Sequence, residues 1–430
     1  MTASSPGERP ELSTGQRLAR LERRYGLVVF LNWFAVILPG AVLVLFAQSR
    51  GLSLAEIGLY GAVYSATAAL LELPTGNLAD KLGRKRVALA GYTLVIFSQL
   101  VLLFAFTLPA FLIYAVLGGL ARALGSGALD AWYVKSLQAV DPDTALQPRL
   151  ARINTVELLA LGTGALLGAG LSALLATWGI SSPLAAVVLA SLLLHVLTLT
   201  VTWRLIEEGP RHQASVLATL RQGLMSLPSA LRAVGQSLRA DAWLPWLLLL
   251  EAVGGVSVAA SETFWQPFFA AHFRLGGSGT TVLGVLLGGC FLAGMLGNLA
   301  SGWLLGLAGG RAHRLGAGSH LVQAAALLAL AWPGQTALWL AAGLFWLTYF
   351  ARTAFSSSLL ALYNGQVGDD RRSLMLSVLS VAFFLGVSLG NLGLGAVSTS
   401  WSISWAWTLT AGVVLLSVGV FPRLRTGTRR

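Results

Sequence analysis

The sequence predicts an all-α membrane protein, with twelve transmembrane helices in two pseudo-symmetric bundles of six. Three observations lead to this fold class. Of the 430 residues, 56% are hydrophobic and only 11% are charged, whereas a soluble domain has about 25% charged residues. Twelve apolar stretches approach the roughly 20 residues that a helix needs to cross a bilayer. The positive charges also fall almost entirely on one side of the topology that these stretches define.

The first bundle is predicted over residues 26–204. Short turns such as Thr107-Leu108-Pro109 separate its apolar stretches, because proline interrupts helices. The alternation of a β-strand is absent, so a membrane barrel is not expected. The six stretches lie near 26–48, 55–76, 87–107, 110–133, 153–177 and 184–203.

The second bundle is predicted over residues 242–421, with turns such as Trp332-Pro333-Gly334. Its six stretches lie near 243–270, 280–306, 316–332, 336–360, 374–396 and 404–421. The polar segment 205–241 between the bundles has leucines at helical spacing, which indicates an amphipathic linker on the membrane surface. A plain flexible linker is the alternative. Residues 1–25 and the basic residues 422–430 are predicted to be tails.

The distribution of Lys and Arg predicts the orientation in the membrane. With the N-terminus in the cytoplasm, 25 of the 29 Lys and Arg lie in cytoplasmic segments, and the outer loops hold only Arg50 and Arg274. Cytoplasmic loops are enriched in these residues, so both termini are expected in the cytoplasm and the chain in the plasma (inner) membrane. The same pattern explains the net charge of +12 without a nucleic-acid partner. The first 25 residues resemble a tail more than a cleaved signal peptide.

Cysteine and histidine usage argues against a metal or a cofactor. Cys290 is the only cysteine, and the five His are scattered without metal-binding spacing. An intrachain disulfide and a cysteine-based zinc site are therefore excluded. A membrane-embedded enzyme would need a metal cluster or a nucleophile beside a base, and none is evident, so we expect neither catalysis nor a bound cofactor.

An internal repeat divides the chain into two related halves. Residues 76–80 read Gly-Asn-Leu-Ala-Asp and residues 297–301 read Gly-Asn-Leu-Ala-Ser, each near the end of the second helix of its half. Arg122 and Arg352 both lie in the fourth helix of their half, and both fifth helices are rich in glycine. We therefore expect a duplicated six-helix unit whose two copies face each other across a central cavity.

The strongest local motif runs from Gly76 to Arg86, in the turn between the second and third helices. Gly76 and Gly83 permit a tight turn and close helix approach. Asp80 is an acid among four cations, so it is expected to pair with Arg84 or to cap a nearby helix. A simple positive-inside loop would explain the cations, but it would explain neither the glycines nor Asp80.

This stretch resembles the signature loop of the major facilitator superfamily: glycine, three residues, aspartate, a basic residue, one residue, glycine, then basic residues. The resemblance extends over about 26–421 through the helix count, the polar linker and the repeat, and the second copy of the loop is degenerate, with Ser301 in place of the acid. Members of this family are transporters in which the loop takes part in conformational switching. The resemblance thus implies a switching role for Gly76, Asp80, Gly83 and Arg84.

Charged residues inside membrane helices are candidates for proton coupling, because such charges are costly there. The candidates are Arg122, Asp130, Glu72, Glu262 and Arg352. Arg122 and Asp130 are eight residues apart, about two helical turns, and are predicted to share a face. The stretch around Arg122 resembles a fourth-helix arginine motif that drug–proton antiporters of the family use in proton transfer. A structural ion pair of Arg122 with Asp130 or Glu72 is the alternative.

Glu262, between Ser261 and Phe264-Trp265, is the candidate proton carrier of the second half, with an ion pair to Arg352 as the alternative. Aromatic and amide side chains near these charges are candidates to line a substrate cavity. Many of the 14 Trp are instead expected at the membrane interfaces. The cavity candidates are Asn32, Trp33, Trp265, Gln266, Trp346 and Tyr349.

Together these features predict a monomeric secondary transporter that alternates between two open states. No nucleotide-binding loop is present, so an ion gradient, preferably of protons, is expected to drive it. The predicted activity is efflux of small apolar or amphipathic compounds, of the multidrug-resistance antiporter type. Proton-coupled uptake of a small metabolite is the alternative, and a non-transporting receptor on the same fold is a third.

Overall fold

The structure is a computed structural model of the whole chain. It describes residues 13–75, 78–125, 127–208, 234–239, 241–275, 279–332, 337–364 and 369–424, and the single positions 221, 225 and 232. Every regular element among these residues is a helix. Most of the predicted amphipathic linker over 205–241 lies outside the described residues.

Among the described residues of the first half there are nine helical segments, which match the six predicted stretches. They are α1 (Thr14–Ile37), α2 (Leu43–Ser49), α3 (Leu54–Thr75), α4 (Leu78–Leu82), α5 (Arg84–Leu103), α6 (Leu108–Gly125), α7 (Ala128–Val140), α8 (Leu146–Thr177) and α9 (Pro183–Leu205). Helix α1 starts twelve residues before the predicted apolar stretch, where Ser13 and Gln16 cap it reciprocally. Its first turns therefore extend beyond the apolar part of the bundle.

The second half also matches its six predicted stretches. Its elements are α11 (Leu244–Thr263), α12 (Trp265–His272), α13 (Gly279–Leu307), α14 (Ala312–Ala331), α15 (Leu338–Asn364), α16 (Asp369–Ser400), α17 (Ile403–Ser417) and the 3-10 helix η1 (Val418–Leu424). Within the described ranges, nine helical spans of the chain are long and apolar enough to cross a membrane. The membrane-type, all-helical fold class is thus confirmed.

Three predicted helices are interrupted. The first breaks between α1 and α2 around Pro39, which has no N–H to donate to a helix. The fourth breaks between α6 and α7, where Gly127 has a φ of 68°, a conformation that glycine adopts without cost. The seventh breaks at Phe264, between α11 and α12. The single helix that was predicted to carry Arg122 and Asp130 on one face is therefore interrupted between them.

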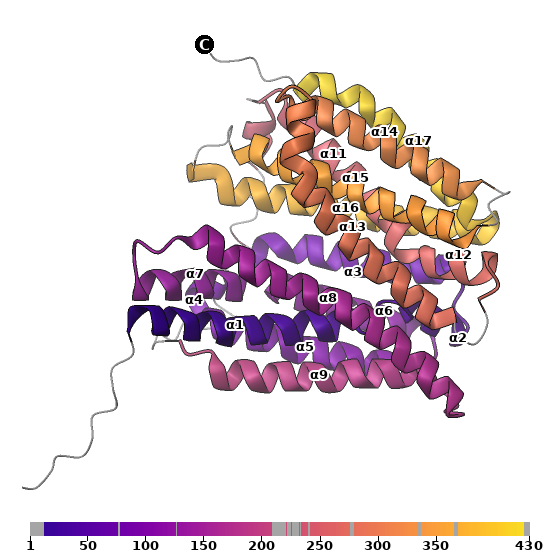
Figure 1. Cartoon of the computed structure of the whole chain (residues 1–430), viewed down its shortest axis with the longest axis horizontal. Coiled ribbons are helices and arrows are strands. Elements are labelled where there is room, and N and C mark those ends of the chain that lie inside the picture. Colours follow the sequence, from indigo (N-terminus) through magenta and orange to yellow (C-terminus); the bar gives the residue numbers. More distant parts are fainter. Residues whose placement is uncertain are drawn as a thin grey trace, which may run out of the picture.

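The two halves pack against each other through symmetric helix pairs. Helix α3 packs on α16, and α8 packs on α13. Each pair joins the second helix of one half to the fifth helix of the other, as a duplicated unit related by a twofold axis requires. Figure 1 shows the first half below and the second half above, with these pairs along their boundary.

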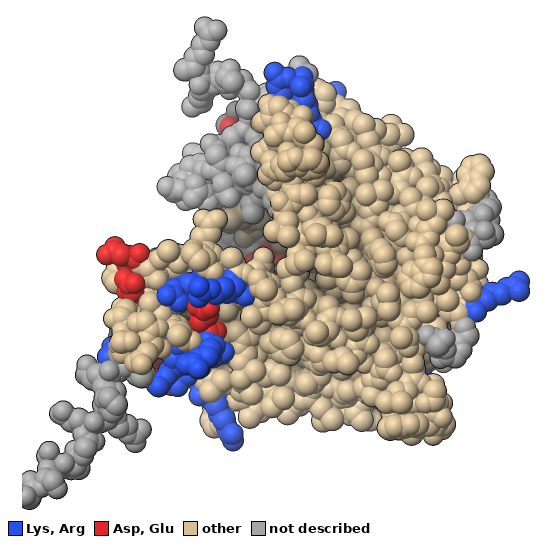
Figure 2. All heavy atoms as spheres, viewed as in Figure 1, with Lys and Arg blue, Asp and Glu red and all other residues tan. Residues whose placement is uncertain are grey.

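The two ends of the bundle differ in charge and in closure. We call the end that holds the start of α1, the α4–α5 turn and the end of α9 the basic end, and the opposite end the far end. Lys, Arg, Asp and Glu gather at the basic end of the first half in Figure 2, and the surface is hollowed there between the halves. Along the pair α8 and α13, the helices touch near the far end and diverge toward the basic end (Figure 1).

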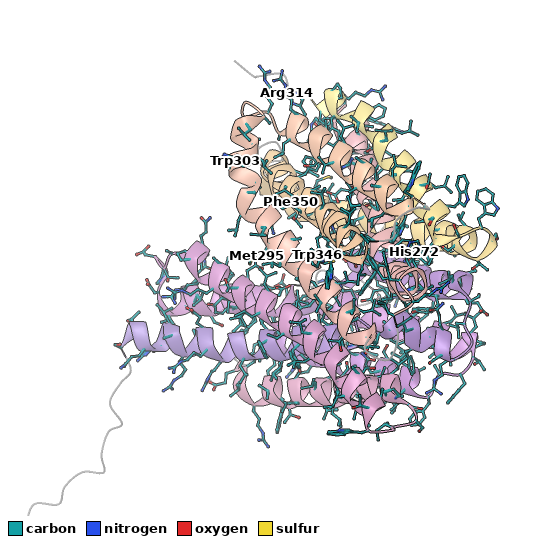
Figure 3. All side chains as sticks on the ribbon, turned by 45° about the vertical axis from the view of Figure 1, so that its right-hand side comes forward. His272, Met295, Trp303, Arg314, Trp346 and Phe350 are labelled. Atoms are coloured by element: carbon teal, nitrogen blue, oxygen red, sulfur yellow. The ribbon has the colours of Figure 1, made fainter. Side chains whose placement is uncertain are left out.

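Glycines let the halves touch at the far end. A Cβ on Gly58 of α3 would collide with the backbone of Asn391 on α16, and one on Gly284 of α13 would collide with Ala169 of α8. The Thr399 hydroxyl accepts a hydrogen bond of 2.8 Å from the Ala55 N–H across the same boundary. Farther along α13, Met295 and Trp303 mark the part that leads away from the first half (Figure 3).

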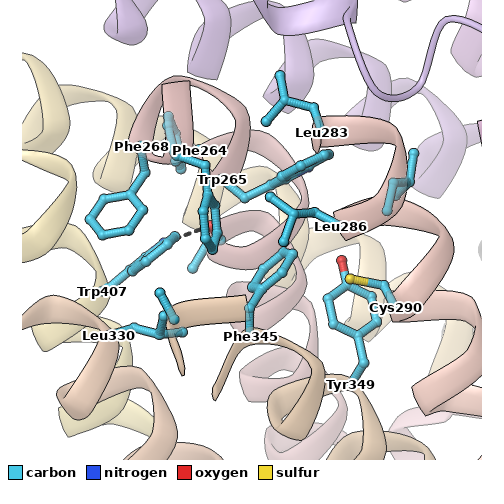
Figure 4. Close-up of a cluster of buried hydrophobic side chains, with 14 of the residues drawn as sticks. Phe264, Trp265, Phe268, Leu283, Leu286, Cys290, Leu330, Phe345, Tyr349 and Trp407 are labelled. Atoms are coloured by element: carbon cyan, nitrogen blue, oxygen red, sulfur yellow. Dashed lines mark hydrogen bonds between the residues drawn. The ribbon is translucent and has the colours of Figure 1, made fainter. Parts of the chain in front are cut away.

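The largest buried apolar cluster lies mainly in the second half and includes aromatic rings of α12, α15 and α17 (Figure 4). Trp265 stacks on Phe345 with ring centroids 5.7 Å apart, and Phe268 packs against Trp407 at 4.3 Å. This cluster fixes α12 beside the far-end contacts between the halves.

Candidate functional site

The predicted switch loop lies at the basic end, between α4 and α5. Asp80 and Arg84 form an ion pair of 2.9 Å, as the sequence suggested, although Asp80 is 59% exposed and Arg84 is buried. Gly83 precedes α5 with a φ of 102°, which favours glycine. Gly76, the first residue of the motif, lies outside the described residues.

Glu208 belongs to this loop in space, and sequence reasoning did not select it. Its carboxylate accepts hydrogen bonds from the backbone N–H groups of Arg84 (2.9 Å) and Lys85 (3.0 Å). It therefore caps the start of α5, where a negative charge is favourable. A Cβ on Gly83 would stand 2.9 Å from a Glu208 carboxylate oxygen, so a side chain at position 83 would disturb the cap.

The residues around Glu208 hold the end of α9 to the first half. The Trp132 indole N–H donates to the Glu207 carbonyl at 2.9 Å, and Arg24 pairs with the Glu207 carboxylate at 3.0 Å. Lys85 donates from its ammonium group to the Trp203 carbonyl at 2.7 Å. The segment that leads into the linker is thereby fixed to α1, α5 and α7.

Asp130 and Arg122 have different surroundings. The Tyr25 hydroxyl donates to the Asp130 carboxylate at 2.6 Å, which joins α7 to α1. No ion pair between Arg122 and Asp130 occurs in the part of the chain described here. The Arg122 guanidinium lies 5.9 Å from the centre of the Phe384 ring, and Phe384 belongs to α16 of the other half.

Arg122 influences two carboxylates of its own half. It acts electrostatically on Glu72 of α3 and on Glu157 of α8, and Asp130 also acts on Glu157. Glu72 also forms a hydrogen bond with Ser380 of α16. Since Phe384 and Ser380 both lie on α16, this charged group faces the boundary between the halves rather than the interior of one bundle.

Glu262 and Arg352 form the ion pair that was the alternative to proton carriage. Their nearest atoms are 3.4 Å apart, and the Arg352 guanidinium lies 4.8 Å from the centre of the Tyr349 ring. The Glu262 side chain is 51% exposed. Its neighbour Thr263 donates to Asn391 at 2.7 Å.

The six candidate cavity residues separate into different environments. Trp265 and Gln266 are each 2% exposed and are packed at the far end, so neither lines an open space in this conformation. Trp346 donates its indole N–H to the Leu286 carbonyl at 2.9 Å and covers Gly289. Tyr349 is buried beside Arg352, and Asn32 and Trp33 are half-buried in the first half. Of these six residues, Tyr349 is the one whose ring contacts Arg352 of the Glu262–Arg352 pair.

Comparisons with known proteins agree with this architecture. A family sequence model described as the Major Facilitator Superfamily matches residues 25–370. No curated protein sequence matches. Among solved structures, a mutant form of the nucleoside transporter NupG superimposes with a TM-score of 0.76 at 14% identity, over 94% of this chain and 100% of that one. A bacterial homologue of the iron transporter ferroportin, in an inward-facing state, gives a TM-score of 0.70 at 16% identity, over 96% and 100% of the two chains.

Proposed function

Because this chain belongs to the major facilitator superfamily, we propose that it is a proton-coupled secondary transporter that expels small apolar or amphipathic compounds. The observation that supports the coupling is the position of Arg122, which lies among the carboxylates of its own half and beside Phe384 of the other half. A charge at such a boundary changes its surroundings whenever the halves move. We also propose that the protein lies in the plasma membrane with both termini in the cytoplasm. It is proposed to work as a monomer.

The proposed cycle depends on competition for the carboxylates. Arg122 acts electrostatically on both Glu72 and Glu157, so a proton that neutralises one carboxylate shifts the attraction of Arg122 toward the other. Movement of α16 changes this balance, because α16 carries Ser380, the partner of Glu72, and Phe384, the partner of Arg122. Proton release on one side and uptake on the other then drive the exchange of substrate against protons.

The substrate region is proposed between the two charged groups, near Trp346 and Tyr349. Aromatic faces suit apolar and amphipathic solutes, and the half-exposed Glu262–Arg352 pair supplies both signs of charge. Proton-coupled uptake is the alternative to efflux. The direction in which a proton gradient drives the substrate across the membrane distinguishes the two.

Transport into proteoliposomes tests the coupling. A panel of fluorescent amphipathic dyes is followed with and without an imposed pH gradient, for the parent protein and for Arg122→Gln. We expect the gradient to accelerate dye movement in the parent, and Arg122→Gln to abolish that acceleration while dye exchange without a gradient persists. Arg274→Gln, at the far end, is the matched control and should behave as the parent. Dye movement that ignores the gradient in the parent would refute proton coupling.

A further inference from the structure

The break in the first membrane helix leaves backbone groups that other helices satisfy. Pro39 has no N–H, so the Ala35 carbonyl lacks its helical donor. The Ser191 hydroxyl of α9 donates to that carbonyl at 2.7 Å. This first repair is made within one half of the molecule, and movement between the halves leaves it intact.

A second repair comes from the other half. In an unbroken helix the Val44 N–H would donate to the Gly40 carbonyl, four residues earlier. Here the Gln266 carboxamide stands between them: its Nε2 donates to the Gly40 carbonyl at 2.7 Å, and its Oε1 accepts from the Val44 N–H at 3.0 Å. One side-chain amide thus takes the place of one helical hydrogen bond, and Gln266 is only 2% exposed.

The corresponding break in the second half is repaired internally. Helix α11 ends before Phe264, and the Trp407 indole of α17 donates to the Ala260 carbonyl at 2.9 Å (Figure 4). The sixth helix of each half therefore supplies a donor to the broken first helix of that half. The amide of Gln266 differs from both Ser191 and Trp407 because its two partners belong to the opposite half.

We propose that Gln266 is a positioning residue of the transport cycle, whose amide holds the far end closed by bridging Gly40 and Val44. When the halves separate there, the amide must withdraw. The Val44 N–H and the Gly40 carbonyl then bond directly, and α1 and α2 join into one helix that keeps a kink at Pro39. Both states satisfy these backbone groups, as the membrane interior demands. The inference rests on the proposed function in one respect: the two halves must separate at the far end during transport.

Distances across the far end test this role. Spin labels are placed at Ser49→Cys on α2 and Ala271→Cys on α12, in the full chain with Cys290→Ser, reconstituted in lipid nanodiscs. Both label sites are exposed, and α2 and α12 are in contact here. Loss of two hydrogen bonds is expected to raise the ratio of long to short distances by roughly tenfold in Gln266→Leu.

Ser191→Ala is the matched control, because it removes the other repair of the same break from within one half. It should lower the thermal unfolding midpoint and leave the distance distribution unchanged. An unshifted distribution in Gln266→Leu, or an equal shift in Ser191→Ala, would overturn the proposal.

A second variant covers the case in which Gln266→Leu does not fold. In Gln266→Glu, the protonated carboxyl can both donate and accept, as the amide does, whereas the carboxylate only accepts. In this variant, the population of long distances should therefore rise as the pH is raised from 5 to 8, by more than any change in the parent. A pH response equal to that of the parent would overturn the proposed bridge. The spin-label distances are measured without substrate and without a pH gradient, so they do not depend on proton coupling. If Gln266→Leu shifts the distances but the parent shows no proton-coupled transport, the proposed function is wrong and the role of Gln266 stands.

Discussion

Arg84 is a buried residue that two different carboxylates hold, one through its side chain and one through its main chain. Asp80 pairs with its guanidinium, and Glu208 accepts from its backbone N–H. The remaining guanidinium nitrogens, Nε and Nη1, have no hydrogen-bond partner within the structure as described. A buried arginine with one partner is sensitive to the loss of that partner, because an unpaired charge is costly away from water.

Replacement of Asp80 by Asn should therefore impair transport more than folding. We expect dye turnover in proteoliposomes to fall about tenfold or more, because Arg84 loses its charged partner in one conformation of the cycle. The thermal unfolding midpoint should change by only a few degrees, since Asp80 is 59% exposed and the amide oxygen of the asparagine can still accept a hydrogen bond from Arg84. Asp143→Asn, an exposed acid in the turn before α8, is the control. Parent-like turnover in Asp80→Asn would contradict a switching role.

Gly83→Ala should destabilise the fold. A φ of 102° is strained for alanine, and the added Cβ would stand 2.9 Å from a Glu208 oxygen. We expect a loss of about 1–3 kcal/mol, measured as a lower unfolding midpoint in detergent. Gly162→Ala is the matched control, because its Cβ meets nothing within 4 Å on α8; it should be neutral or slightly stabilising. Equal midpoints for the two variants would show that the turn is unstrained.

Whole elements show why spacing along the chain was an incomplete guide to packing. Helix α8 carries four closely spaced glycines. A Cβ on Gly164 would meet α1 and one on Gly168 would meet Leu38 directly after it, whereas a Cβ on Gly162 or Gly170 would meet nothing within 4 Å. Helix α5 depends on a cap that arrives from the end of α9. The stability of one helix terminus is thus set by a residue 124 positions away.

Glu208→Ala should loosen the start of α5. Loss of a capping carboxylate costs about 1 kcal/mol, and the basic stretch from Lys81 to Arg86 should become more susceptible to trypsin. Glu207→Ala is the control: it loses an exposed ion pair to Arg24 but keeps the carbonyl that Trp132 binds. Cleavage rates that are the same in both variants would contradict the capping role.

At the scale of the whole molecule, the two halves are joined at the far end and diverge along α8 and α13 toward the basic end. The joining contacts are hydrogen bonds and glycine-to-backbone approaches rather than ion pairs. Such contacts are short-ranged, so they favour two discrete arrangements of rigid halves over gradual bending.

A disulfide across the far end should stop the cycle. Ala55→Cys and Thr399→Cys in a Cys290→Ser background place two thiols where the backbone N–H of one residue now bonds the hydroxyl of the other, 2.8 Å apart. Oxidation should abolish dye transport, and a reductant should restore it, because the halves can no longer separate there. A pair within the first half, Ser98→Cys with Tyr114→Cys, should not respond. Transport that survives a verified cross-link would exclude movement at this end.

The sequence by itself determined the all-helical membrane fold class and the duplication, and it offered the pairing of Asp80 with Arg84 as one of two roles for Asp80. These properties follow from hydropathy, charge and local spacing, which act over one helix or one turn. Helix α1 began earlier than expected only because capping by Ser13 extended it beyond the apolar stretch. The predicted roles of Arg122, Asp130, Glu72, Glu262 and Arg352 in coupling remain predictions.

Tertiary structure alone decided which distant groups meet. It joined Asp130 to Tyr25, paired Glu262 with Arg352, brought Glu208 to the switch loop, and buried Gln266 against the broken first helix. The physical reason is that a hydrogen bond acts only at contact, and contact between residues 222 positions apart, such as Val44 and Gln266, is set by how two bundles pack rather than by either local sequence.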